Sequence, residues 1–186
     1  MATLETFRER LLEQYRKVEI RPIDFSYAIR TACFRLWLEP SPLKCFTLKQ
    51  TGEGICICCP ADVDFSCEQV QKLVRAAILR ALKKSAGSYL PPLLEALAER
   101  YGFSYRKVKI TGARSRWGSC SAAGTISLSC YLMLLPPHLM DYVLLHELSH
   151  TKEMNHGPRF WELLDSLTEG KALSLRAELR NYRPAF

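Results

Sequence analysis

The stretch LHELSHTKEMNHG, residues 145–157, decides how this chain is interpreted. It holds three of the chain's four histidines, His146, His150 and His156, and an acid, Glu147, directly follows the first of them. Apolar residues surround the first part of the stretch, with the periodicity of a helix that has a buried side. A protein with so few histidines and such a cluster is expected to use the cluster for chemistry.

Residues 146–150 read H-E-x-x-H, and this spacing has a chemical meaning on a helix. Positions i and i+4 lie on one face, one turn apart, so His146 and His150 can point at one ion. Glu147 lies beside that face, where its carboxylate can act on an activated water without filling a ligand position. Neutral imidazoles are common ligands of Zn²⁺. The pattern therefore predicts one catalytic zinc ion, with Glu147 as the general base.

Catalytic zinc usually has three protein ligands and one open position, so a third ligand must be found. His156 follows His150 by six residues, and Asn155 and Gly157 allow the chain to turn back toward the helix. This spacing matches the third histidine of H-E-x-x-H-x-x-G-x-x-H, except that Glu153 stands where that pattern has glycine. We expect a longer helix before the turn, ending near residues 155–157. The competing third ligands are carboxylates on the next predicted helix: Glu162, Asp165 and Glu169.

The composition is that of a soluble globular protein, with 48% hydrophobic and 24% charged residues. No apolar run approaches the ~20 residues that a membrane helix needs. The first 17 residues alternate charged with apolar side chains, unlike a secretory signal, so a cytoplasmic protein is expected. The net charge of +7 favours anionic partners without identifying one.

Eight cysteines are scattered along the chain without a C-x-x-C pair, which argues against disulfides and a zinc knuckle. Cys56, Cys58 and Cys59 lie in an apolar run, ICICCP. On a strand, Cys56 and Cys58 share one face, and Cys59 lies on the other. We interpret them as small buried side chains, with a metal site as the alternative.

The predicted elements alternate between helices and groups of strands. Ser66 with Gln69 forms a capping-box pattern at the start of a helix, and Pro91–Pro92 is expected to start a second one that ends at Gly102. The strand TISLS (125–129) is expected at a sheet edge over the cleft, where an extended peptide can add as another strand. The full order is a short amphipathic helix within 1–17, three strands before residue 60, helices over 67–84 and 91–101, strands over 103–130, and helices beginning near 136, 158 and 173.

This order is typical of the α+β class rather than of alternating βαβ units. We expect an N-terminal helix and β-rich extension over residues 1–65. Residues 66–186 are expected to form the core, in one compact unit with the extension.

Four motifs in this order resemble the YgjP-like metallopeptidases, relatives of the SprT-like and WLM zincins. They are SRWGSCS (115–121), ISLS (126–129), DYVLLHELSH (141–150) and NHGPRFW (155–161), and the resemblance covers most of residues 66–165. It implies a minimal zincin-like core, in which a small β-sheet packs on helices and one helix carries H-E-x-x-H. It also implies zinc ligands at His146, His150 and His156, and a general base at Glu147.

Other residues are candidates for contacts with the substrate or the transition state, because an oxyanion needs a hydrogen-bond donor. The loop RWGSC (116–120) is expected to border the cleft. The basic run over residues 106–116 is either a solvated face or a surface for nucleic acid. The candidate contact residues are Tyr131, Tyr142, Arg114 and Arg116, with His138 as a further candidate donor.

The sequence therefore predicts a zinc-dependent metallopeptidase that hydrolyses peptide or protein amides with activated water. The alternative is a non-catalytic zinc-containing module that binds nucleic acid or an acidic partner. The two differ in whether the zinc ion keeps an open position or is closed by a fourth protein ligand. The sequence predicts neither a membrane partner nor an oligomeric state.

Overall fold

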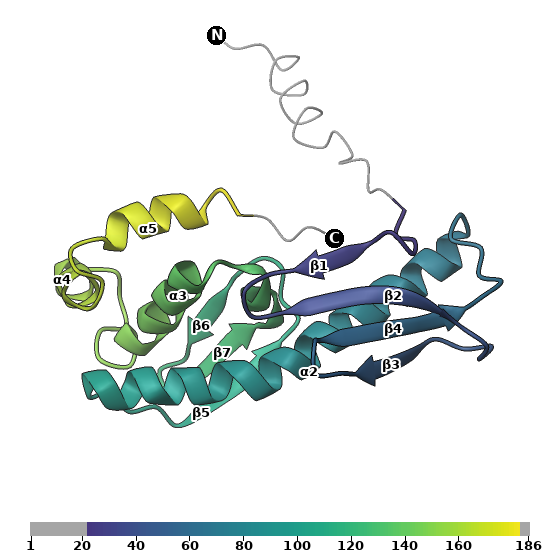
Figure 1. The fold of residues 1–186 in the computed structure, drawn as a ribbon. Coiled ribbons are helices and arrows are strands. Elements are labelled where there is room, and N and C mark those ends of the chain that lie inside the picture. The colour runs from purple at the N-terminus through teal and green to yellow at the C-terminus, as the bar shows by residue number, and fades with distance from the viewer. Residues whose placement is uncertain (1–21, 183–186) are drawn as a thin grey trace, which may run out of the picture.

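The computed structural model describes residues 22–182, so the predicted helix within residues 1–17 lies outside the described part. Two small sheets lie along one long helix, α2 (Glu68–Tyr101), and shorter helices follow. Figure 1 shows the first sheet beside the N-terminal half of α2, and the second sheet with the remaining helices beside its C-terminal half. The predicted α+β class is confirmed.

The first sheet contains four strands, where the sequence predicted three. The extra strand arises because a turn from Thr31 to Phe34 divides the apolar run 27–38: the N–H of Thr31 donates to the carbonyl of Phe34, and the N–H of Phe34 donates to Oγ1 of Thr31. The stretch TGEG (51–54) connects β3 and β4, which pair antiparallel as a hairpin. The strands are β1 (Ala28–Arg30), β2 (Arg35–Ser41), β3 (Thr47–Gln50) and β4 (Ile55–Pro60), in the order β1-β2-β4-β3.

Helix α2 is continuous across Pro91 and Pro92, so the prediction of two helices is wrong. Two prolines remove two backbone donors, and each ring crowds the carbonyl four residues earlier. The helix continues because its buried stripe does, with Ala86 and Leu90 before the prolines and Leu94 after them. Burial of this stripe outweighs the local preference for a break.

The ends of α2 agree only in part with the sequence patterns. Gly102 ends the helix as predicted, in the left-handed conformation at φ 65°. The predicted capping box is wrong, because Cys67 is the N-cap and makes no side-chain cap bond. The hydroxyl of Ser66 instead donates to the Asp64 carboxylate at 2.7 Å.

The second sheet has the order β5-β7-β6, and it builds one wall of the candidate site. Its strands are β5 (Lys107–Thr111), β6 (Gly118–Cys120) and β7 (Thr125–Ser129). Strand β7 pairs parallel with β5 and antiparallel with β6, so TISLS lies in the middle of the sheet and the prediction of an edge is wrong. Strand β6 follows β5 in the chain but pairs with the other side of β7, so this short strand lies at one edge of the sheet.

After β7 a short 3-10 turn, η1 (Cys130–Leu134), leads into three helices: α3 (Pro137–Ser149), α4 (Pro158–Leu167) and α5 (Ala172–Leu179). One hydrophobic core runs from Ile23 to Ala172 and includes side chains of both sheets. No helix within residues 22–182 is long and apolar enough to cross a membrane. The division at residues 65 and 66 stays a prediction.

Candidate metal centre

Three imidazoles meet at the C-terminal end of α3. Nε2 of His146 lies 3.2 Å from Nε2 of His150 and 3.1 Å from Nε2 of His156. One ring nitrogen from each histidine can be chosen so that all three lie within 4.8 Å of one another. Within residues 22–182, this is the only group of three or more histidine, cysteine or acidic side chains close enough to hold a metal ion.

The spacing of these nitrogens fits a small divalent cation. Four tetrahedral ligands at ~2.0–2.1 Å from an ion stand about 3.3 Å apart, close to the two separations seen here. Burial, and then the neighbouring histidines, lower the pKa of His146 to about 3, so its imidazole is neutral at physiological pH. Neutral imidazole is the form that binds metals. The residues present therefore fit the predicted zinc ion.

Helix α3 ends at Ser149, earlier than the sequence predicted, so the expected longer helix is wrong. The hydroxyl of Thr151 donates to the carbonyl of Leu148 at 2.7 Å and takes an acceptor that a further helical turn would use. The chain then turns, and Nδ1 of His150 donates to the backbone carbonyl of Glu153 at 3.1 Å. This bond holds the ring and leaves Nε2 of His150 free of a proton in the neutral form.

Phe160 on α4 packs against all three imidazoles, stacked on His150 and edge-on to His146 and His156. It is fully buried, and its ring centroid lies 4.9 Å from that of His146, 4.6 Å from that of His150 and 4.7 Å from that of His156. The indole N–H of Trp161 donates to the backbone carbonyl of His156 at 3.1 Å and anchors the exposed member of the group. Helix α4 therefore positions the returning histidine, a role that the sequence pattern of α4 did not reveal.

Glu147 lies next to the histidines and is only 5% exposed. Burial raises the pKa of its carboxyl to about 8. Its Oε2 atom has no hydrogen-bond partner among the described residues, nor does Nδ1 of His146. An unpartnered buried carboxyl is costly in a folded protein and often marks a functional site.

The loop RWGSC borders the site, as expected. A Cβ atom on Gly118 would lie 2.6 Å from Oε1 of Glu147 and 2.7 Å from its Cγ, so strand β6 passes directly against this side chain. Burial, and then Glu147, raise the pKa of the Cys120 thiol two residues further along β6. Strand β6, at an edge of the second sheet, therefore packs against Glu147 of α3.

The other candidate residues lie on α3, in η1 and in the loop before β6. Tyr142 lies one turn before His146 on α3, with ring centroids 6.0 Å apart, and its buried hydroxyl has no hydrogen-bond partner within residues 22–182. Tyr131 is buried, and the guanidinium of Arg114 lies 5.8 Å from its ring centroid. Arg116 lines a small cavity on the second sheet together with Ser119.

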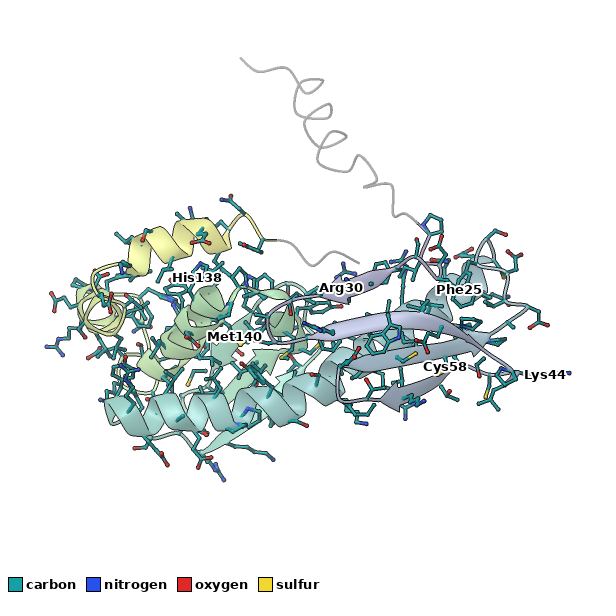
Figure 2. The ribbon with its side chains drawn as sticks, in the orientation of Figure 1. Phe25, Arg30, Lys44, Cys58, His138 and Met140 are labelled. Carbon is teal, nitrogen blue, oxygen red and sulfur yellow. The ribbon has the colours of Figure 1, made fainter. Side chains whose placement is uncertain are left out.

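Three residues that the sequence offered as an oxyanion donor or as alternative third metal ligands have other partners. Figure 2 shows His138 at the start of α3 beneath α5, where its Nε2 lies 2.9 Å from the Glu178 carboxylate. Among the alternative third ligands, Asp165 accepts the N–H of Ala172, and Glu169 pairs with Lys171 at 2.9 Å.

Sequence reasoning also missed Arg176. Its guanidinium on α5 lies 5.0 Å from the ring centroid of Trp161. Its charge adds to the burial and the histidines that lower the pKa of His146, and it opposes the rise that burial causes in the pKa of Tyr142. No residue spacing in the sequence relates α5 to the H-E-x-x-H helix. The charge of Arg176 comes near the site only through the packing of α5 in the folded chain.

The cysteine run of β4 is a separate feature. Sγ of Cys56 and Sγ of Cys58 lie 3.9 Å apart, so the two side chains share a face as predicted, and Cys59 is fully buried. Burial raises the pKa of Cys56 to about 12 and that of Cys59 to about 11. These properties fit buried apolar side chains.

Comparison with known proteins gives one family. No curated protein sequence matches the chain. The crystal structure of the metallopeptidase zymogen of Pyrococcus abyssi abylysin is 27% identical, covers 50% of this chain and 94% of its own, and has a TM-score of 0.43, too low to equate the folds. The sequence profile of the YgjP-like metallopeptidase domain matches residues 4–182. The chain therefore belongs to the YgjP-like metallopeptidase family.

Proposed function

We propose that this protein is a zinc-dependent peptidase with His146, His150 and His156 as the metal ligands and Glu147 as the general base. The observation that carries the proposal is the convergence of three imidazole nitrogens beside a buried carboxyl whose Oε2 has no partner among the described residues. Membership of a metallopeptidase family supports the reaction class.

The three histidines would hold the ion, and no fourth protein ligand joins them within residues 22–182. When bound, zinc supplies Lewis acidity, which polarises a carbonyl group and lowers the pKa of water. An open ligand position is typical of catalytic rather than structural zinc. This feature favours a peptidase over a non-catalytic zinc module.

Glu147 would take the proton of the attacking water and pass it to the departing amine. Burial holds the pKa of its carboxyl near 8, and a cation beside it favours the ionised form that can accept a proton. Oε1 of Glu147 packs against Gly118, which limits the room for the carboxyl on this side. A fixed base within reach of the water is what proton transfer requires.

The substrate would be a peptide or protein segment in extended conformation. Strand β6 is an edge strand, and its residues Gly118 and Cys120 lie on the face that meets Glu147. An extended peptide can pair with such an edge through backbone hydrogen bonds, which places its amide bonds along the acid and the histidines.

The test is the Glu147→Gln variant, loaded with zinc and assayed for cleavage of a mixture of dye-quenched peptides. The expected result is one bound zinc ion, as in the wild type, with hydrolysis lower by at least about 100-fold. Glu162→Gln, which removes an exposed acid from α4, is the matched control and should keep activity.

Two outcomes would contradict the proposal. Undiminished hydrolysis by Glu147→Gln would remove Glu147 from the mechanism. A wild-type protein that binds zinc in full yet cleaves no peptide of the mixture would favour the non-catalytic binding module.

A further inference from the structure

The outer face of the second sheet is polar and basic. Ile126 and Leu128 of β7 are fully buried on the inner face, so the residues between and beside them point outward. Cross-strand pairs share a face, and Lys107 pairs with Thr125 while Lys109 pairs with Ser127. Ser119 of β6 also pairs with Ser127. The outer face therefore carries lysines on β5 and hydroxyl groups on β6 and β7.

No acidic residue occurs between Glu99 and Asp141, although this segment builds the whole second sheet. The segment holds six basic residues and therefore carries a formal charge of +6, against +7 for the entire chain. The positive charge of the protein is thus concentrated in one structural unit. The six residues are Arg100, Arg106, Lys107, Lys109, Arg114 and Arg116.

A cavity of about 200 Å³ lies at the end of this outer face, where β5, β6 and β7 meet the loop before β6. Arg116 lines it together with Thr111, Ser119 and Ser127. The hydroxyls of Ser119 and Ser127 make no hydrogen bond within residues 22–182. A guanidinium beside free hydroxyl donors, with no carboxylate in the lining, is suited to an anionic oxygen group such as a phosphate.

The charges of this face are not neutralised internally. Among residues 22–182 the ion pairs are Lys72–Glu68, His138–Glu178 and Lys171–Glu169, and none includes Lys107, Lys109 or Arg116. No aromatic side chain points outward from β5, β6 or β7, so the face has no platform for stacking unpaired bases. Positive charge with hydroxyl donors and no stacking platform matches the backbone of a duplex rather than a single strand.

We propose that the outer face of the second sheet binds duplex nucleic acid through its phosphate backbone, independently of sequence. Lys107 and Lys109 contact successive phosphates, and the Arg116 cavity holds another. This surface lies on the opposite side of β6 from Glu147, so a bound duplex leaves the His146 cluster accessible.

The experiment measures binding of a short fluorescent DNA duplex by the full-length wild type, by fluorescence anisotropy over a salt series. The test variant is Lys107→Gln/Lys109→Gln/Arg116→Gln. Each phosphate contact contributes about −0.9 to the slope of log K against log salt, so the triple variant should reduce that slope by roughly 2 to 3. At low salt its affinity should fall by at least about tenfold.

The matched control is Arg30→Gln/Lys44→Gln/Lys49→Gln, which removes the same charge and residue types from β1, β3 and the loop between β2 and β3. Figure 2 shows Lys44 at the end of the molecule away from the second sheet. The control should bind the duplex nearly as well as the wild type, and circular dichroism should confirm that both variants are folded. Removing zinc should not change duplex binding, so this test is separate from that of peptidase activity.

Three results would overturn the proposal. The first is the absence of salt-dependent duplex binding by the wild type. The second is an equal loss of affinity in both triple variants, which would indicate general attraction to a basic protein. Competition by polyglutamate as strong as that by unlabelled duplex would indicate an acidic protein as the partner instead.

Discussion

Gly118 and Glu147 are in such close contact that a Cβ atom on residue 118 would lie 2.6 Å from Oε1 of the acid. The glycine is needed here for space, because β6 passes against the α3 side chain that we propose as the base. The Gly118→Ala variant should therefore displace the carboxyl and lower kcat by up to about 100-fold, while the zinc content stays at one ion per chain. Peptide cleavage and metal analysis on the same preparation test this.

Gly87→Ala is the control for this prediction. Gly87 lies inside α2, and a Cβ there meets nothing within 4 Å. Alanine favours helix over glycine, so this variant should gain about 0.5–1 kcal/mol in the free energy of unfolding and keep full activity. Full activity in Gly118→Ala would show that Glu147 tolerates displacement.

The grouping of the three histidines could be predicted from the sequence, but the path of the backbone between His150 and His156 could not. H-E-x-x-H fixes its own geometry because its residues are one helical turn apart. The position of His156 depends on Thr151 and on the backbone carbonyl of Glu153, and no side-chain pattern encodes a backbone acceptor. The same limit explains α2, where long-range burial overrides the local signal of Pro91 and Pro92.

The bond from His150 to Glu153 uses the backbone of residue 153, so the side chain of that residue should matter little. Glu153→Ala should keep zinc affinity within about threefold of the wild type, because the carbonyl acceptor is retained. Competition with a chromophoric chelator measures this affinity. A loss of tenfold or more would mean that the Glu153 carboxylate itself takes part in the metal site.

Phe160 contacts all three imidazoles, so its ring should influence metal binding beyond its contribution to stability. Phe160→Leu keeps an apolar side chain but removes the ring that stacks on His150 and meets His146 and His156 edge-on, and zinc affinity should fall about tenfold. Leu164→Val, at another fully buried position of α4, is the control. It should lower the free energy of unfolding by ~1 kcal/mol without changing zinc affinity. Equal zinc affinities in the two variants would contradict the role of the ring.

Removal of zinc should lower the melting temperature, because the ion binds only where the fold brings distant ligands together. At a free zinc concentration about 1,000 times the Kd, binding adds ~4 kcal/mol, or roughly 10 °C in a chain of this size. His156→Ala should lose most of this shift, and His138→Ala should keep it, since His138 pairs with Glu178. Calorimetry with and without a chelator checks both variants, and a full shift in His156→Ala would exclude it as a ligand.

The thiols of the chain should react in an order set by burial. Cys45 is exposed, whereas Cys56 and Cys59 are buried with pKa values raised to about 12 and about 11, so almost no thiolate forms there near neutral pH. Since the thiolate is the reactive form, iodoacetamide at pH 8 should modify Cys45 first and reach Cys56 and Cys59 only after unfolding. Peptide mapping by mass spectrometry gives the order. The labelling rates at Cys56 and Cys59 should be unchanged by a chelator. Faster labelling after chelation would indicate a metal bound to the β4 cysteines.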